Sequence, residues 1–190
     1  MKATIGSMFN TSKNSRVKRS LDRIAMATYS LCKTTTLRDL TVTAIAKKAG
    51  VTRKTFYRNF DDVIDVIDYG FASHVIPLYE DPRCETYYDF LLSIIGFSSN
   101  YKELLLLCQK QEQFSLLTRL GLKYLPSSSY VQLVCGRHTN EPGFENAFSL
   151  LVASFTAALI QDWVSDGFQD TPAQVASKGA SALKALGDVD

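Results

Sequence analysis

A group of hydrogen-bond donors lies between Thr52 and Phe60 of this 190-residue chain. Their side chains can donate to a phosphate oxygen or to the acceptors of a base edge, and none of them is acidic. The donors are Arg53, Lys54, Thr55, Tyr57, Arg58 and Asn59. Donors of this kind bind the backbone and the base edges of double-stranded DNA. The segment therefore predicts a surface that contacts a nucleic acid.

Two short helices joined by a tight turn are expected to position these donors. Thr41 and Thr52 are of a residue type that caps helix N-termini. Gly50 lies between the two helices, where the chain needs a residue that tolerates positive φ. Phe56 and Phe60 are four residues apart and therefore share one buried face of the second helix. This pattern is typical of a helix-turn-helix, whose second helix presents its exposed side chains to DNA.

Two threonines are expected to add contacts at the N-termini of these helices, namely Thr43 and Thr52. On the preceding segment, four basic residues are placed for phosphates: Arg16, Lys18, Arg19 and Arg23. Two short helices around a glycine also occur in helical domains that bind no DNA, so the motif alone does not decide the function.

The charge distribution favours the DNA-binding interpretation. Residues 1–60 contain 13 Lys and Arg against 2 Asp and Glu, a net charge of +11. Residues 61–190 contain 8 basic and 17 acidic residues, a net charge of −9, which leaves +2 for the whole chain. A solvated charged face is the alternative, but it rarely separates the signs so sharply along a chain. A polyanionic partner accounts for the basic first third.

These residues resemble the N-terminal domain of the tetracycline-repressor (TetR) family of bacterial transcription regulators. The matching residues are Thr41-Val42, Ile45-Ala46, Ala49-Gly50-Val51, Thr55-Phe56-Tyr57 and Phe60, with Ile24, Ala27, Thr28, Leu31 and Cys32 in the preceding helix. The resemblance implies an all-α fold, with an N-terminal helix-turn-helix DNA-binding domain followed by a helical ligand-binding and dimerisation domain. It also implies a repressor that binds a palindromic operator as a homodimer and is released by a small-molecule effector.

The domain organisation follows from the same comparison and from the composition. We expect a flexible N-terminal arm over residues 1–15, the DNA-binding domain over 16–62 and the effector-binding and dimerisation domain over 63–190. Periodic apolar positions predict helices over 16–33, 41–49, 52–60, 61–75, 82–98, 100–110, 112–124, 129–137, 144–168 and 172–186. The helix that begins at Asp61 is expected to end before Pro77 and to carry any effector signal to the DNA-binding domain.

Aromatic residues accumulate after Pro82, where charged residues become fewer. Core filling is the simpler interpretation of most of them, but a helical body lined with tyrosines can also enclose a ligand. The candidate pocket residues are Tyr87, Tyr88, Phe90, Phe114 and Phe155. An enclosed cavity would favour a small-molecule effector. An exposed apolar patch would favour the alternative, a TetR-like co-activator or interaction protein whose body binds a protein partner.

The segment from Phe144 to Phe168 is apolar almost all round, so a second copy of the chain is expected to cover part of it. The candidate interface residues are Phe148, Ala153, Ala157, Ile160, Trp163 and Leu183. Trp163, Gly167 and the downstream Pro172 resemble the closing helix pair of a TetR-family subgroup. In the family, that pair forms the dimer as a four-helix bundle.

The sequence offers no constellation for catalysis, so we expect neither an enzyme nor a cofactor. Cys135, His138 and Glu141 could supply metal ligands, but their spacing is a weak signal and we predict no metal site. Four scattered cysteines and the absence of a signal peptide indicate the cytoplasm. The uncharged run from Ala147 to Ile160 is too short to span a bilayer, so no membrane association is expected.

Overall fold

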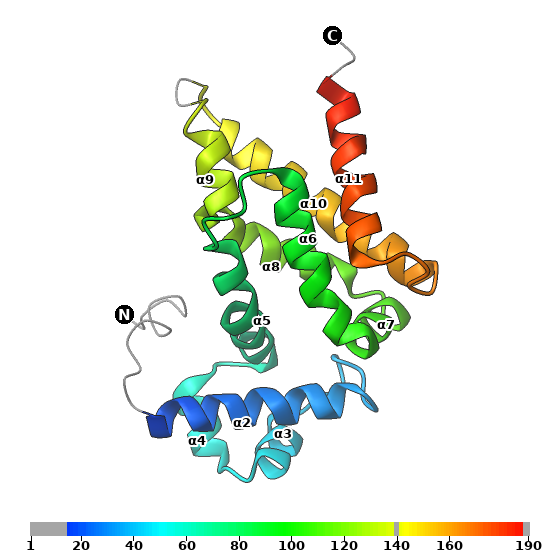
Figure 1. The fold of residues 1–190 in the computed structure, drawn as a ribbon. Coiled ribbons are helices and arrows are strands. Elements are labelled where there is room, and N and C mark those ends of the chain that lie inside the picture. The colour runs from blue at the N-terminus through cyan, green and yellow to red at the C-terminus, as the bar shows by residue number, and fades with distance from the viewer. Residues whose placement is uncertain (1–14, 139–140, 188–190) are drawn as a thin grey trace. The chain divides into compact units, whose positions relative to one another are not determined.

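The computed structural model describes residues 15–138 and 141–187, and within these ranges all regular structure is helical (Figure 1). The predicted all-α fold is confirmed. The chain divides into two compact units, residues 1–74 and 75–190. The boundary falls inside one helix, α5 (Val63–Tyr79), rather than at residue 62 where we expected it. The predicted N-terminal arm lies outside the described residues except for Ser15, where α2 begins.

The first unit is built around apolar side chains that meet from four helices. Ile24, Ile45 and Phe56 are fully buried, and Val66 and Phe60 complete the same cluster. Burial of side chains of this size contributes about 1.5–3 kcal/mol each, so this small core holds the short helices in place. The helices are α2 (Ser15–Cys32), α3 (Val42–Ala49), α4 (Arg53–Asn59) and the first part of α5.

The second unit is a bundle in which the long helix α10 packs against α7, α8, α9 and α11. Figure 1 shows α11 (red) beside α6 (green), which is the most extensive packing of the unit. The elements are α6 (Tyr87–Ser98), η1 (Ser99–Tyr101), α7 (Lys102–Lys110), α8 (Phe114–Tyr124), η2 (Leu125–Ser127), α9 (Ser129–Cys135), α10 (Phe144–Ser165) and α11 (Pro172–Gly187).

A glycine allows α11 to approach α6 closely. A Cβ atom at Gly179 would lie 2.5 Å from Leu159 Cδ1 and 2.8 Å from Leu91 Cδ1. On the same face of α11, Val175 and Ala176 are buried. Side chains from α6 and α10 therefore occupy the space that a larger residue at position 179 would need.

Three helix boundaries differ from the sequence prediction by three residues or more, each for a local reason. The helix predicted over 82–98 begins at Tyr87, because Thr86 and Asp89 form a capping box. Helix α5 continues through Pro77 to Tyr79, because an exposed proline in the last turn removes only the one hydrogen bond that its amide would donate to the Ser73 carbonyl. Helix α10 ends at Ser165, before the left-handed residues Gly167 (φ +68°) and Phe168 (φ +60°).

The tryptophan near this helix end stabilises the turn that follows. The Trp163 indole nitrogen donates to the Asp170 carbonyl at 2.8 Å, and the Phe168 ring stands edge-on to Trp163. The ammonium group of Lys102 lies 5.6 Å and 4.6 Å from the centroids of these two rings. The spacing Trp163-x-x-x-Gly167 thus has a structural role in closing α10.

Two stretches of the described residues, 87–110 and 144–165, are long and apolar enough to cross a membrane by length and composition. Helix α10 is therefore longer than the uncharged run from Ala147 to Ile160, which we considered too short to span a bilayer. Much of α10 is buried against its neighbours, as in the core helix of a globular domain, so this feature is weak support for a membrane span.

Candidate nucleic-acid interface

The turn between α3 and α4 is set by caps on both helices. Thr41 accepts a hydrogen bond from the Ala44 amide at 3.2 Å and begins α3. Gly50 ends it in the left-handed region, at φ 62° and ψ 40°, and the Val51 amide donates to the Ala46 carbonyl at 3.0 Å. This bond pattern reverses the chain direction within two residues, so the predicted role of Gly50 is confirmed.

Arg23 of α2 is part of this turn. Its guanidinium group donates to the carbonyl of Ala49 and, at 2.9 Å, to the carbonyl of Gly50. A cation at this place satisfies the free carbonyls at the C-terminus of α3 and complements its dipole. Arg23 is exposed and makes these bonds through one nitrogen, so the expected phosphate contact of Arg23 stays a prediction beside its role as a cap. A contact across 26 residues leaves no local signal in the sequence.

Helix α4 uses some of its predicted donors internally. Thr52 caps the helix by accepting from the Thr55 amide at 3.1 Å, and the two threonine hydroxyls lie 3.0 Å apart. The Asn59 amide nitrogen donates to the Thr55 carbonyl at 2.7 Å, and both side chains are half-buried. The structure thus gives Thr52, Thr55 and Asn59 roles in stabilising α4.

The remaining donors point to solvent. Arg53, Lys54 and Arg58 are exposed, and Tyr57 keeps 47% of its surface exposed while its neighbour Phe56 is fully buried. Thr43 is exposed on α3, as are the basic residues of its last turn, Lys47 and Lys48. Neither α3 nor α4 contains an acidic residue. Our site prediction omitted these two lysines of α3, although the sequence shows two basic residues in the last turn of the predicted helix.

The two acidic residues of the first 60 have partners elsewhere in the first unit. Asp22 accepts the hydroxyl of Tyr69 at 2.7 Å and lies 3.6 Å from the ammonium of Lys18. Asp39 accepts from the Thr36 hydroxyl. Burial, followed by the bond to Asp22, raises the pKa of Tyr69 above its ordinary value. Both aspartates lie outside α3 and α4, whose own charged residues are all basic.

The N-terminus of α5, which follows α4 directly, is closed by carboxylates. Asp65 accepts from the Asp61 amide at 2.8 Å, and Asp62 accepts from the Asp65 amide at 2.9 Å. The predicted use of a carboxylate at this helix start is confirmed for Asp62, and the helix begins at Val63.

The fold is similar to that of a solved structure described as a dihydroxyacetone kinase operon activator, DhaS. The two share 14% sequence identity at a TM-score of 0.58, over 88% of this chain and 95% of that chain. This similarity is one of fold. No protein-family model matches the chain, and a search of curated proteins finds no match.

The predicted pocket residues lie at different places in the second unit. Tyr87, Phe90 and Phe114 are buried, whereas Tyr88 and Phe155 are half-buried. The centroid of Tyr87 lies 6.1 Å from that of Phe90 and 6.3 Å from that of Phe155.

Further contacts tie Tyr87 into this packing. Its ring also contacts Tyr130 of α9 at 5.8 Å, and its hydroxyl lies 3.2 Å from that of Thr156. Burial raises the pKa of Tyr87 to about 12, so the phenol is neutral at physiological pH. Tyr87 thus packs against two other predicted pocket residues, Phe90 and Phe155.

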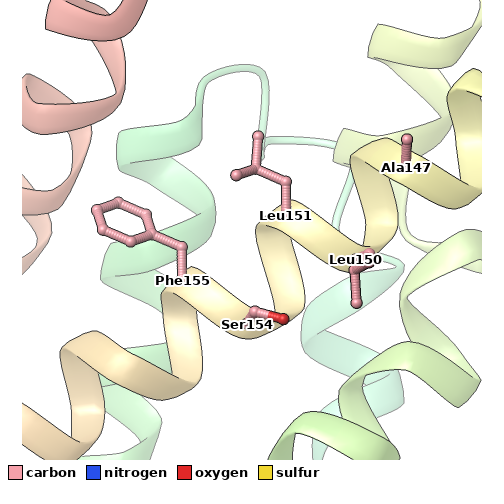
Figure 2. Close-up of a pocket in the computed structure, with 5 residues that line it drawn as sticks. All are labelled: Ala147, Leu150, Leu151, Ser154 and Phe155. Carbon is pink, nitrogen blue, oxygen red and sulfur yellow. The ribbon is translucent and has the colours of Figure 1, made fainter.

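An open apolar groove of about 540 Å³ lies instead on the outer face of α10. Figure 2 shows the lining side chains along this helix, where Leu151 and Phe155 project from one side of the ribbon and Leu150 and Ser154 from another. Ala147 completes the lining near the start of α10. Phe155 is the one member of the predicted pocket that this groove includes.

The residues predicted for a dimer interface mostly face the interior of the single chain. Ala153, Ala157, Ile160 and Trp163 are buried in it, and Phe148 and Leu183 are half-buried. The exposed apolar face of α10 carries different residues. Leu150 and Leu151 there expose 53% and 44% of their surfaces. Leucines this exposed and adjacent form an apolar patch that a folded chain usually covers.

The weak metal candidates make other contacts. His138 Nδ1 lies 3.0 Å from a Glu141 carboxylate oxygen, and the histidine ring stacks on Phe144 at 4.3 Å between centroids. Cys135 is half-buried, and this burial raises the pKa of its thiol. Among the described residues, no three side chains of the metal-binding types come together.

Proposed function

We propose that this protein is a cytoplasmic, DNA-binding regulator of transcription and that α4 enters the major groove of its operator. The observation that carries this proposal is the exposed face of α4, where Arg53, Lys54, Tyr57 and Arg58 follow a capped turn and no carboxylate is present. A helix of this kind fits the major groove, where its N-terminal residues reach base edges. The fold similarity to a protein named an operon activator supports regulation as the function.

We propose further that the protein acts as a homodimer whose contact is the exposed face of α10. Leu150 and Leu151 supply apolar area, and the small residues Ala147, Ser154 and Ala158 let a second helix approach closely. This interface replaces the buried set that the sequence suggested. A two-fold dimer requires a near-palindromic operator with half-sites one or more helical turns apart, each turn about 34–36 Å.

The mode of control has two candidates. In the first, a small-molecule effector binds among the aromatic rings around Tyr87 and releases a repressor from DNA, as the family resemblance implies. In the second, the body binds a protein partner and the chain acts as a co-activator. The packed contacts of Tyr87, Phe90 and Tyr130 favour the second. A ligand of the first kind would have to displace rings that already contact one another.

The experiment uses the full chain and an operator selected from a pool of duplexes with roughly 20 randomised base pairs, which spans two helical turns. Arg53→Ala, Lys54→Ala and Arg58→Ala each remove one exposed cation of α4. Lys110→Ala is the matched control, since it removes an exposed cation of α7 in the second unit. Dissociation constants are measured by fluorescence anisotropy at fixed salt.

We expect each α4 variant to weaken operator binding by about 1–3 kcal/mol and Lys110→Ala to leave it within about 0.5 kcal/mol of wild type. Equal affinity for the operator in all four variants and the wild type would refute the assignment of α4.

A thermal-shift screen with small molecules, followed by operator titration with any ligand found, separates the two modes of control. Only the first mode predicts a ligand that changes operator affinity.

A further inference from the structure

Only a few side chains of α4 can make two hydrogen bonds to one base. Arginine pairs in this way with guanine through its planar fork, and asparagine pairs with adenine, whereas a lysine such as Lys54 lacks the fork and is a point charge on a flexible stem. The amide nitrogen of Asn59 already donates to the Thr55 carbonyl, within a half-buried side chain. Arg58 lies in the last turn of α4, away from the N-terminal part of the helix that reaches base edges. Arg53 is exposed at the first residue of α4.

The guanidinium of Arg53 is held over an aromatic ring. Its central carbon lies 5.9 Å from the ring centroid of Tyr57, one helical turn further along the same face. The Tyr57 ring is itself held edge-on against Phe56, with centroids 5.6 Å apart and planes at 82°. Phe56 is fully buried in the core of the first unit. Contacts therefore run from the core through Tyr57 to Arg53.

We propose that Arg53 reads a guanine in each half-site and that Tyr57 is a positioning residue that orients its guanidinium. The proposal rests on the function proposed above and adds the base that α4 selects. A bidentate contact to guanine O6 and N7 requires the planar fork in one orientation. The Tyr57 ring beneath the Arg53 guanidinium limits the orientations of that group before DNA binds, so less conformational entropy is lost on binding. The oriented guanidinium then discriminates more strongly between guanine and the other bases.

The first test removes one acceptor from the DNA. In the selected operator, each guanine is replaced in turn by 7-deazaguanine, which keeps Watson–Crick pairing and O6 but lacks the N7 acceptor. At one symmetric position the wild-type chain is expected to lose roughly 5- to 100-fold in affinity. In Arg53→Ala the same replacement should have no effect, because the group that bonds to N7 is gone. Arg53→Lys keeps the charge but lacks the fork, so it should bind more weakly and discriminate less.

The second test separates the ring of Tyr57 from its hydroxyl. Tyr57→Phe keeps the ring under Arg53, and Tyr57→Leu removes it. The readout is the ratio of affinities for the guanine operator and for its 7-deazaguanine form. We expect Tyr57→Phe to preserve this ratio and Tyr57→Leu to reduce it roughly 2- to 5-fold, in line with an exposed cation–π contact. Unchanged melting temperatures of both variants exclude a loss of fold as the cause.

The outcomes separate this inference from the proposed function. If wild type and Arg53→Ala respond equally to 7-deazaguanine at every guanine of a specifically bound operator, the inference is wrong and the regulator assignment stands. If Tyr57→Leu keeps the full ratio, Tyr57 has no positioning role. If the selection yields no sequence that binds better than a scrambled duplex, both the inference and the function are overturned.

Discussion

Two features of the structure require a glycine at position 50, namely a left-handed backbone and the closeness of the Arg23 guanidinium. Its backbone lies at φ +62°, and a Cβ atom there would lie 2.7 Å from a guanidinium nitrogen of Arg23. Any other residue must therefore accept the left-handed conformation and also displace the cation that caps α3. The conformational cost alone is about 1–2 kcal/mol for alanine. The turn that sets the direction of α4 thus depends on an interaction with α2 as well as on the glycine.

We predict that Gly50→Ala lowers the free energy of unfolding by about 2 kcal/mol or more, measured by urea denaturation. Arg23→Ala removes the guanidinium and leaves room for the methyl group, so the double variant should lose less than the sum of the two single variants. Strictly additive losses would mean that Arg23 and Gly50 do not interact. Lys33→Ala, at the exposed residue after α2, serves as a control for the loss of one cation.

At the residue scale, the sequence predicted what is local. Thr41 and Thr52 were recognisable as caps, and Gly50 as a helix end, because each signal lies within four residues. The roles of Arg23 and Asn59 were not predicted. Arg23 reaches carbonyls 26 and 27 residues away, and Asn59 could not be known to bond internally until its rotamer was seen.

At the scale of elements, two glycines inside helices have opposite surroundings. Gly70 of α5 has no heavy atom within 4 Å of an ideal Cβ position among the described residues. A glycine at position 70 is therefore not required for close packing among the described residues. Gly179 of α11 meets Leu91 and Leu159 at short distance. Sequence alone cannot distinguish such glycines, because the difference arises from tertiary packing.

These surroundings predict effects of opposite sign. Gly70→Ala should raise the free energy of unfolding by about 0.5–1 kcal/mol, through helix propensity and a smaller unfolded-state entropy. Gly179→Val should lower it by about 1–3 kcal/mol, because two leucines must move. Gly70→Val is the control for valine in a helix and should change stability by no more than about 0.5 kcal/mol. A stable Gly179→Val protein would show that α6 and α11 are less closely packed than described.

Most helices lie where the spacing of apolar residues predicted them, but several begin or end at other residues than predicted. The period of a helix such as α10 extends over many residues, so its existence was predictable. The starts and ends depended on details such as the Thr86 capping box and the left-handed Phe168. The inward face of α10 was not predictable, because this helix is apolar almost all round and the period gives no preferred side.

At the scale of the whole molecule, the exposed leucines of α10 predict the oligomeric state. We expect the wild-type chain to sediment as a dimer at micromolar concentration and Leu151→Glu to sediment as a folded monomer, since a charge at a tightly packed interface is left without a partner. Leu106→Glu is the matched control, because Leu106 of α7 is similarly exposed, at 47% against 44% for Leu151. It should remain a dimer. A wild-type monomer would contradict the proposed interface.

The separation of charge along the chain has its consequence at this scale too. A basic first unit and an acidic remainder are expected to keep the second unit away from DNA while the first unit binds it. Lys54 and Arg58 on each α4 give a dimer about four phosphate contacts, apart from the arginines assigned to guanine. Binding must then weaken steeply as salt displaces these contacts.

The salt dependence of operator affinity measures how much of the binding comes from contacts between basic residues and phosphates. The affinity of the full chain is measured for the selected operator and for a scrambled duplex of the same length and composition, across a range of salt concentrations. We predict a slope of log affinity against log salt of about −4 or steeper, and a preference for the operator of roughly 10³-fold or more. A slope near zero, or equal affinity for the two duplexes, would contradict the assignment of this protein as a sequence-specific DNA-binding regulator.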